Sequence, residues 1–249
     1  MHLATVVTIL LLHGGGFVGG TTQEVKPFAD DLRDAGYHVV VVDYLADNPN
    51  GNVLGEIGTV KRAADAARAD GPVVAYGLSA GATLAADLAA RGEVDGAVVA
   101  GGPTDLLTWF CLSPLTSAGY WAGLGMTPTD RRAASPQFLL DGHPSPQLLM
   151  YGDIDPLVQI NQGLDYYDAA RKQQPDTQFV LMPVAPHTFR QPYPTEAKQW
   201  IEARWPAGDL RPTTLKDRIR IPRVSGAAHP AARHAKRSAK AKKRATRRR

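Results

Sequence analysis

Short runs of branched apolar residues alternate along this chain with longer stretches in which apolar positions recur at helical spacing. Most of the runs are continuous in Val, Ile and Leu, as expected for strands that helices cover on both faces. Six strands are predicted, over Thr5–Leu12, His38–Asp43, Val73–Leu78, Gly96–Ala100, Gln147–Tyr151 and Gln178–Met182. Five helices are predicted among them, over Thr22–Ala35, Ile57–Ala69, Ala80–Arg91, Pro156–Gln173 and Thr195–Arg204. This alternation predicts a mostly parallel sheet in an α/β fold.

Two stretches depart from the alternation. The segment Gly102–Pro146 is rich in Pro, Gly and aromatic residues, and a connection this long between two strands is typical of a functional lid. After Pro206 the periodicity ends, and the chain finishes in HAKRSAKAKKRATRRR, a composition that cannot bury enough apolar surface to fold alone. We therefore predict one domain over residues 1–206, with a small lid at about 102–146, and a disordered basic tail over 207–249.

Charge is distributed unevenly between the domain and the tail. Residues 207–249 carry 15 of the 28 Lys and Arg but only two of the 24 acidic residues, which leaves the tail at a net charge of +13 and residues 1–206 at −9. Charge this dense attracts polyanions in a salt-dependent way and without sequence readout. Three roles stay open for the tail: a solubilising end, a contact for nucleic acid, and an anchor on an anionic surface.

Several function classes are disfavoured by what the sequence lacks. The apolar run VVTILLL is too short to span a bilayer, and it has neither the basic region nor the cleavage site of a secretory signal, so we expect a soluble, cytoplasmic protein. Cys111 is the single cysteine, so no internal disulfide can form. Because no His or acidic residues stand at metal-ligand spacing, we predict neither a metal nor a cofactor.

The sequence GLSAG at residues 77–81 lies directly after a predicted strand and directly before a predicted helix. This is the setting of a G-x-S-x-G nucleophile elbow, in which Ser79 projects its hydroxyl from a tight turn. Gly77 and Gly81 would keep side chains away from the neighbouring backbone, and the N–H of Ala80 at the helix N-terminus would face a developing oxyanion. The alternative is that Ser79 only caps its helix.

A serine hydroxyl needs a base to take its proton and a carboxylate to orient that base. The chain offers both after later strands. Asp153 and Asp155 follow the strand at Gln147–Tyr151, and His187 follows the strand at Gln178–Met182. This order of Ser, acid and His is the one found in α/β-hydrolases. A surface position for His187 is the alternative.

Residues 13–17 read HGGGF and follow the first predicted strand. Three consecutive glycines indicate either an ordinary turn or a loop whose bare N–H groups face a negative charge. A nucleotide-phosphate loop is disfavoured, because neither G-x-G-x-x-G nor a following Gly-Lys-Ser/Thr occurs. We predict a structural, hydrogen-bonding role for His13 rather than that of a base.

Six motifs occur in one order over roughly residues 5–205: HGGGF, VVDYLA, GLSAG, the ASP of Ala134–Pro136, GDIDPLV and PHTF. In these motifs the chain resembles the hormone-sensitive-lipase-type esterases of the α/β-hydrolase superfamily. The resemblance implies an α/β-hydrolase fold. It also implies that the triad acid is the residue before Pro, Asp155, with Asp153 a hydrogen-bonding neighbour. It further implies that Gly15 and Gly16 donate N–H groups to the oxyanion hole.

The chain also departs from that family in two places. Leu78 stands where lipase-type members usually carry an acidic residue, and SAGATLA is closer to small acetylesterases and arylformamidase-like members. The family usually has two strands and a cap segment before the HGGG strand, whereas this sequence starts almost at that strand. We therefore expect a minimal or truncated member, whose acyl selectivity does not follow from the resemblance.

These motifs predict a serine hydrolase that cleaves carboxylic esters of small to medium acyl groups through an acyl-enzyme. Phe17, Trp109, Phe110 and Trp121 are candidates to line the acyl pocket, with ordinary core positions as the alternative. The same machinery would serve an amide, formamide or thioester substrate. A catalytically inactive hydrolase-like body that carries a polyanion-binding tail is a third hypothesis, against which the complete motifs argue.

Overall fold

A computed structural model describes residues 6–48, 51–110, 114–140, 142–187 and 195–207. All of them belong to one compact unit, Met1–Ile219. Cys111, the predicted strand start at Thr5 and nearly all of the basic tail lie outside the described residues. Within the described part of the chain, no helix has the length and apolar character needed to cross a membrane.

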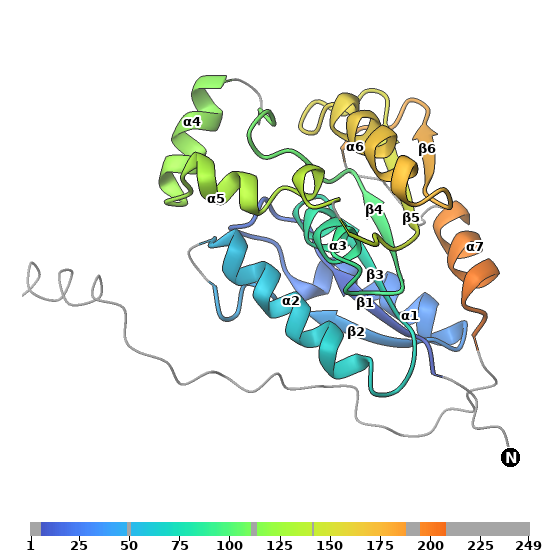
Figure 1. The fold of residues 1–249 in the computed structure, drawn as a ribbon. Helices are drawn as coiled ribbons and strands as arrows, with labels where there is room; N and C mark the ends of the chain where they lie inside the picture. Colours follow the sequence, from blue (N-terminus) through green and yellow to red (C-terminus); the bar gives the residue numbers. More distant parts are fainter. Residues whose placement is uncertain (1–5, 49–50, 111–113, 141, 188–194, 208–249) are drawn as a thin grey trace, which may run out of the picture. The chain divides into compact units, whose positions relative to one another are not determined.

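The described residues form one six-stranded sheet, and every pair of neighbouring strands in it is parallel (Figure 1). The order of strands across the sheet is β2-β1-β3-β4-β5-β6. Their bounds are β1 Thr8–Leu12, β2 His38–Val42, β3 Val73–Leu78, β4 Gly96–Ala100, β5 Gln147–Gly152 and β6 Gln178–Met182. The predicted parallel α/β architecture is confirmed.

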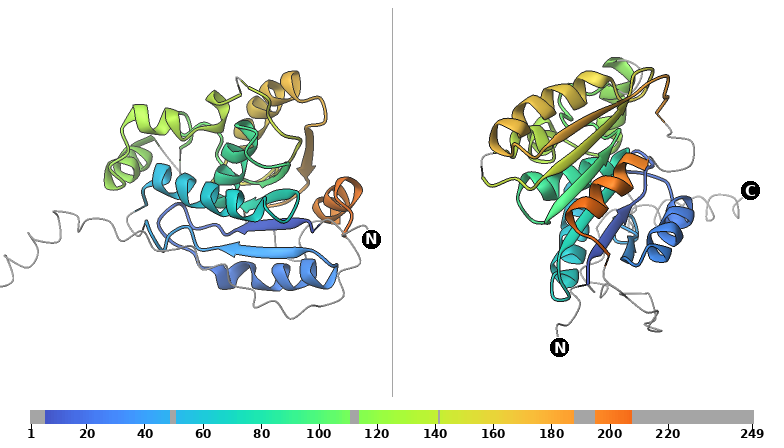
Figure 2. Two further views of the ribbon diagram at one scale, coloured as in Figure 1. Left: turned by 60° about the horizontal axis from the view of Figure 1, so that its bottom comes forward. Right: turned by 90° about the vertical axis from the view of Figure 1, so that its right-hand side faces the viewer.

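Helices lie on both faces of this sheet (Figure 2). Helices α1 and α7 pack on one face, where Phe28, Leu32 and Trp200 join side chains of the strands in a buried apolar cluster. Helices α2, α3 and α6 cover the other face. The helices span α1 Lys26–Asp34, α2 Val53–Ala67, α3 Ala80–Ala90, α4 Pro114–Gly123, α5 Pro128–Ala133, α6 Ile160–Gln173 and α7 Thr195–Arg204.

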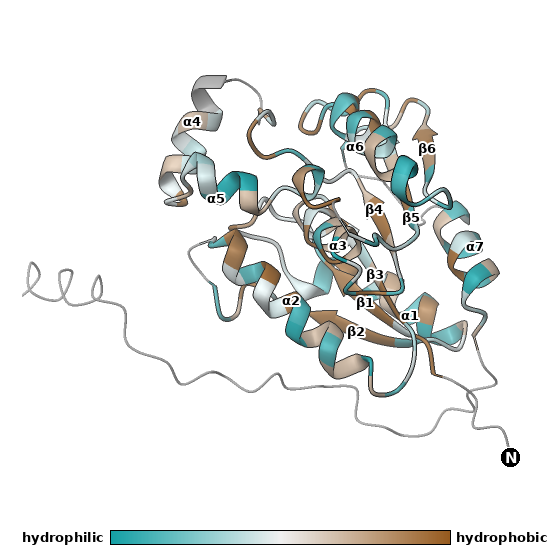
Figure 3. Cartoon of the chain, in the orientation of Figure 1, coloured by the Kyte–Doolittle hydropathy of each residue, from teal (hydrophilic) through white to brown (hydrophobic). Residues whose placement is uncertain are grey.

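Burial explains why the strands are continuous apolar runs. All residues of β1, β4 and β5 are buried, on both sides of the pleat. The hydropathy colouring shows apolar strands inside and polar positions on the outward sides of the helices (Figure 3). A strand whose two faces are both covered has no polar face to alternate with.

Several predicted element ends are wrong by a few residues, for local reasons. The helix predicted over Thr22–Ala35 is divided into a 3-10 turn at Thr22–Val25 and α1, which has Pro27 in its first turn. Helix α2 begins at Val53 because the Asn52 side chain accepts the N–H of Gly55 as an N-cap.

The parallel sheet decides where the loops of interest lie. In a parallel sheet the carboxyl ends of all strands share one edge, and ligand sites of open α/β sheets form there. HGGGF follows β1, GLSAG follows β3, GDIDP follows β5 and PVAPH follows β6. Four motifs that are separated by up to 174 residues along the chain are thereby brought to the same edge.

Candidate active site

Ser79 stands on a sharp turn between β3 and α3. Its backbone has φ 52° and ψ −119°, one of three non-glycine residues with positive φ among those described. A Cβ at Gly77 would lie 2.0 Å from the carbonyl oxygen of Gly81, and one at Gly81 would lie 2.4 Å from that of His13. The flanking glycines are therefore required by backbone contacts. A non-glycine residue in this backbone conformation costs about 1–3 kcal/mol, and residues strained in this way cluster at functional sites.

The Ser79 side chain does not cap α3. It makes no capping hydrogen bond to that helix, and its Oγ lies 2.8 Å from Nε2 of His187. The backbone N–H of Ser79 donates to Ala100 O at 2.9 Å, which holds the turn against β4. The hydroxyl is thus directed at the imidazole and away from its own helix.

Asp155 lies on the other side of the same imidazole. Its Oδ2 is 2.7 Å from Nδ1 of His187, and its carboxylate is fully buried while the His187 side chain is 13% exposed. Its Oδ1 accepts the backbone N–H groups of Leu157 at 2.8 Å and Val158 at 2.9 Å. Carboxylate oxygens accept hydrogen bonds, so the tautomer that fits these contacts has its proton on Nδ1, and in that tautomer Nε2 accepts from the Ser79 hydroxyl.

The bonds to Leu157 and Val158 also explain another boundary. The helix predicted from Pro156 begins at Ile160, because the preceding N–H groups serve the Asp155 carboxylate.

Asp153 occupies a different position from Asp155. It is exposed, and its Oδ1 accepts the N–H of Ala185 at 3.3 Å, two residues before His187. Gly152 allows the loop after β5 and the loop after β6 to lie this close together, since a Cβ at Gly152 would lie 2.1 Å from Ala185 O. Asp153 therefore braces the loop that carries His187.

The glycine loop lies directly beside Ser79. A Cβ at Gly14 would be 3.3 Å from the Cβ of Ser79. Three successive residues then have positive φ, with Gly15 at 124°, Gly16 at 60° and Phe17 at 64°. In the described part of the chain, the N–H groups of Gly15 and Gly16 make no hydrogen bond. They remain free to serve a ligand.

Each of the four carbonyls from His13 to Gly16 accepts a hydrogen bond. His13 O accepts from the Tyr44 hydroxyl at 2.7 Å, and Gly14 O from Nδ1 of the His13 ring at 2.6 Å. The remaining donors are the N–H groups of Val18 and Gly19 on Gly15 O, at 3.2 and 2.9 Å, and the Tyr120 hydroxyl on Gly16 O. With its carbonyls held by the protein, the loop can present N–H groups instead.

His13 is held inside this loop by its own contacts, as expected for a structural, hydrogen-bonding residue. Its ring is fully buried and stacks on Tyr44, with centroids 4.4 Å apart. Sequence reasoning did not single out Tyr44 or Tyr120, because one tyrosine carries no motif. The only available signals were the DY of VVDYLA and the concentration of aromatic residues in the lid segment.

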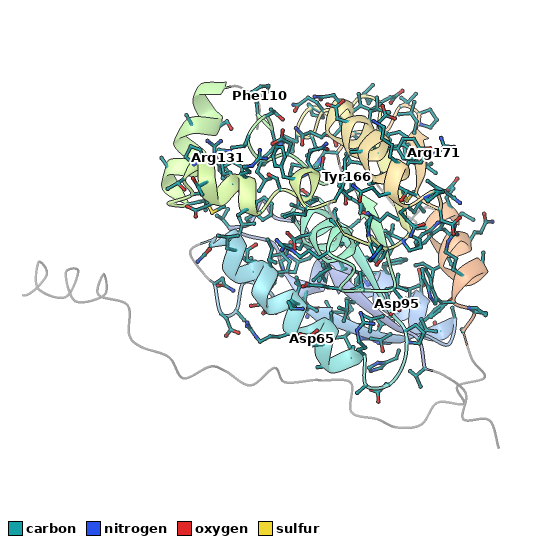
Figure 4. The ribbon with its side chains drawn as sticks, in the orientation of Figure 1. Asp65, Asp95, Phe110, Arg131, Tyr166 and Arg171 are labelled. Carbon is teal, nitrogen blue, oxygen red and sulfur yellow. The ribbon has the colours of Figure 1, made fainter. Side chains whose placement is uncertain are left out.

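The predicted lid segment, about residues 102–146, contains α4, α5 and a 3-10 turn at Pro136–Phe138, where the apolar pattern predicts no helix. Three of the predicted pocket residues, Phe17, Trp109 and Trp121, are at most 5% exposed, whereas Phe110 is 45% exposed on the segment before α4 (Figure 4). The ring centroid of Trp121 lies 6.4 Å from that of Phe17 and 5.7 Å from that of Trp109. These three rings belong to one buried cluster, and their role toward an acyl group stays a prediction.

No group of three or more His, Cys, Asp and Glu that could hold a metal ion occurs among the described residues. The arrangement as described brings together a hydroxyl, an imidazole, a buried carboxylate and backbone N–H groups that make no hydrogen bond among the described residues.

Comparisons with known proteins agree with this architecture. A family model described as "Alpha/beta hydrolase family" matches residues 9–246. No curated protein matches the chain by sequence. Among solved structures, the chain is similar to a thermophilic esterase, Est2, of the Planctomycetes species Thermogutta terrifontis, with TM-score 0.65, 16% identity, and 84% of this chain and 85% of that one covered.

Two further solved structures are similar to the same extent. One is an acetyl ester-xyloside bifunctional hydrolase from Caldicellulosiruptor lactoaceticus, with TM-score 0.66, 18% identity, and 82% and 85% of the two chains covered. The other is the Thermogutta terrifontis esterase 2 phosphonylated by sarin, with TM-score 0.65, 17% identity, and 81% and 82% covered. At these identities the likeness shows a shared fold.

Proposed function

The chain belongs to the alpha/beta hydrolase family, and from that premise we propose that it is a serine esterase with Ser79, His187 and Asp155 as its catalytic triad. The observation that carries the proposal is the unbroken chain of contacts from Ser79 Oγ to His187 Nε2, at 2.8 Å, and from His187 Nδ1 to Asp155 Oδ2, at 2.7 Å. Nucleophile, base and orienting acid at hydrogen-bond distance are the requirements for an acyl-transfer site.

In the proposed mechanism, Ser79 Oγ attacks the carbonyl carbon of the ester while His187 Nε2 accepts the hydroxyl proton. The tetrahedral oxyanion is stabilised by the N–H groups of Gly15, Gly16 and Ala80. Ala80 opens α3, so its N–H has no partner within the helix. His187 then protonates the leaving alcohol, and the acyl-enzyme is opened by a water molecule that His187 activates.

We further propose carboxylic esters with small to medium acyl groups as substrates, and a place among the hormone-sensitive-lipase-like members. HGGGF after β1 and GLSAG after β3 support the placement. The buried rings of Phe17, Trp109 and Trp121 support the size limit, because they fill space beside the glycine loop. Two structural neighbours agree with short acyl groups, since one is an acetyl ester-xyloside hydrolase and the other is an esterase with propionate bound.

The test is hydrolysis of p-nitrophenyl acetate, butyrate and octanoate by the wild type and by Ser79→Ala. We expect turnover that disappears in Ser79→Ala and falls as the acyl chain lengthens. Ser145→Ala is the matched control, because its buried hydroxyl donates to Val94 O, away from the loops that carry the triad. Equal, negligible rates in wild type and Ser79→Ala would refute the esterase, and a fluorophosphonate label at another residue would refute the nucleophile.

The same assay separates the alternatives. An amide, formamide or thioester hydrolase would turn over p-nitroacetanilide, a formanilide or a thioester, whereas an enzyme confined to carboxylic esters would leave these three uncleaved. An inactive hydrolase-like body would turn over none of them.

We propose separately that the basic tail binds polyanions without sequence preference. Its net charge of +13 against −9 for residues 1–206 supports this. A chain truncated after Pro206 should keep its esterase kinetics and elute from heparin at low salt, whereas the full chain should be retained. Equal elution of both chains would contradict the proposal, and loss of activity on truncation would place the domain boundary elsewhere.

A further inference from the structure

Helix α4, in the predicted lid segment, contacts the glycine loop through a side-chain hydrogen bond to its backbone. The hydroxyl of Tyr120, in the middle of α4, donates to the backbone carbonyl of Gly16. The approach is close enough that a Cβ at Gly16 would lie 3.2 Å from that hydroxyl. The other carbonyls of the loop are held by His13, by Tyr44 or by the loop's own N–H groups. Tyr120 is the donor that comes from the lid.

The planarity of the peptide bond turns this contact into an orienting one. In a trans peptide the C=O and the following N–H point in opposite directions, so a held carbonyl fixes both groups. Gly15 O accepts from Val18 and Gly19, which fixes the Gly15–Gly16 peptide. Tyr120 fixes the next peptide, Gly16–Phe17. The first contact sets the direction of the Gly16 N–H, and the second holds the peptide on the other side of Gly16. Gly16 has no side chain and φ of 60°, so these two held peptides are the main restraints on the position of its backbone.

Tyr120 is itself held in place by its neighbours. Its ring makes edge contacts with Trp109 and Trp121, at centroid distances of 6.0 and 5.2 Å. Nε1 of Trp109 donates to Leu157 O at 2.8 Å, and the N–H of Leu157 donates to Asp155. One aromatic unit therefore touches both the glycine loop and the loop that carries the proposed triad acid.

We propose that Tyr120 is a positioning residue for the oxyanion hole: its hydroxyl holds the Gly16–Phe17 peptide and thereby anchors Gly16 from its C-terminal side, which keeps the Gly16 backbone in place beside the reacting carbonyl. This inference rests on the proposed esterase function. It adds a lid residue to the machinery, and it makes the oxyanion geometry dependent on where α4 sits.

The test compares Tyr120→Phe with Tyr37→Phe. Tyr37 is the matched control because its hydroxyl also donates to a backbone carbonyl, Trp205 O at 3.0 Å. Tyr37 directly precedes β2, so it lies at the amino ends of the strands, whereas the candidate site lies at their carboxyl ends. Loss of a whole oxyanion donor lowers kcat by about 10²–10³-fold. A donor that is only misdirected should cost less, so we expect about a tenfold fall in kcat for Tyr120→Phe with KM within about twofold. Tyr37→Phe should keep the wild-type kcat.

A second substrate distinguishes positioning from a general structural effect. Sulfur accepts hydrogen bonds poorly, so the thiono analogue of p-nitrophenyl acetate gains little from an oxyanion hole. The oxo-to-thiono rate ratio is independent of how much enzyme is folded. We expect this ratio to fall about tenfold in Tyr120→Phe and to stay unchanged in Tyr37→Phe.

The outcomes are separable. A fall in kcat with an unchanged oxo-to-thiono ratio would overturn the positioning role, as would an unchanged kcat. A wild type whose turnover does not depend on Ser79 would instead refute the esterase itself, and the inference with it.

Discussion

Alanine at Gly15 and alanine at Gly16 should have very different effects, although the two glycines are neighbours. At Gly15, φ is 124°, and an added Cβ would lie 1.9 Å from Gly19 O. That is a backbone atom, which would have to retreat by roughly 1.5 Å to reach ordinary contact. The same stretch of backbone donates the Gly19 N–H to Gly15 O at 2.9 Å. Gly15→Ala therefore breaks a contact that directs the Gly16 N–H.

At Gly16 the obstacles are smaller. Its φ of 60° lies in the left-handed region, which costs an alanine about 1–2 kcal/mol. The added Cβ would lie 3.2 Å from the hydroxyl at the end of the Tyr120 side chain, which can give by a few tenths of an ångström.

We expect kcat for p-nitrophenyl acetate to fall about 10²–10³-fold in Gly15→Ala, equivalent to about 2.7–4 kcal/mol of transition-state stabilisation, and about tenfold or less in Gly16→Ala. The positive φ at Gly15 alone should lower the free energy of unfolding by about 1–3 kcal/mol, and the displaced backbone adds to that loss, so kcat is referred to the folded fraction that urea denaturation gives.

Gly58→Ala is the control for the substitution itself. Gly58 lies within α2, and a Cβ there would meet only the end of Arg62 at 3.5 Å. The change should stabilise the helix by about 1 kcal/mol and leave kcat unchanged. The reasoning would be refuted if Gly16→Ala were as damaging as Gly15→Ala, or if Gly15→Ala kept kcat within about threefold of the wild type.

Further predictions concern the two aspartates after β5, a strained valine after β6 and a buried glutamate in α2. Asp155→Asn should lower kcat about 10⁴-fold by disturbing the tautomer of His187, whereas Asp153→Asn should stay within about twofold, since an amide oxygen can still accept the Ala185 N–H; similar losses in both would contradict the assignment. Val184→Gly should raise the free energy of unfolding by about 1 kcal/mol in urea, because a β-branched residue with φ of 54° is strained; lower stability would count against that strain. Glu56 is buried without a hydrogen-bond partner among the described residues, and burial raises its pKa from 4.5 to about 8. The folded state therefore keeps a proton that the unfolded state loses, so wild-type stability should fall as pH rises from 4.5 to 8, and Glu56→Gln should remove up to about 1.4 kcal/mol of that loss per pH unit; parallel pH profiles would exclude this role.

Much of the fold follows from sequence because the strands are doubly covered. VVAYGL and GAVVA have no polar alternation, and the structure has strands at Val73–Leu78 and Gly96–Ala100 as predicted. Helices α4 and α5 could not be predicted in the same way. Helix α4, PLTSAGYWAG, contains two glycines, each of which lowers helix propensity, and its formation depends on packing of Tyr120 and Trp121 against distant residues.

The residues of the candidate site could be predicted from sequence, but the contacts that orient them could not. Ser79, Asp155 and His187 each follow a strand within a recognisable motif, so their convergence at one sheet edge could be expected from parallel topology alone. The contacts that orient them have no motif. The Tyr120 hydroxyl reaches a carbonyl 104 residues away, and such a pairing depends on three-dimensional packing that no local pattern encodes.

The strand order has a consequence for how the molecule is made. From β4 onward, each strand pairs with the strand synthesised just before it, so a nascent sheet can grow at one edge in the order in which its strands are synthesised. Until β6 is added, the growing sheet ends at β4 or β5, whose residues are all buried in the folded protein, and such an open apolar edge is a template for association with other chains. Ser79 is delivered early and His187 only after the last strand. A partly synthesised chain would therefore hold Ser79 in its strained turn without the proposed base, and the proposed chemistry would begin only after β6 has covered β5.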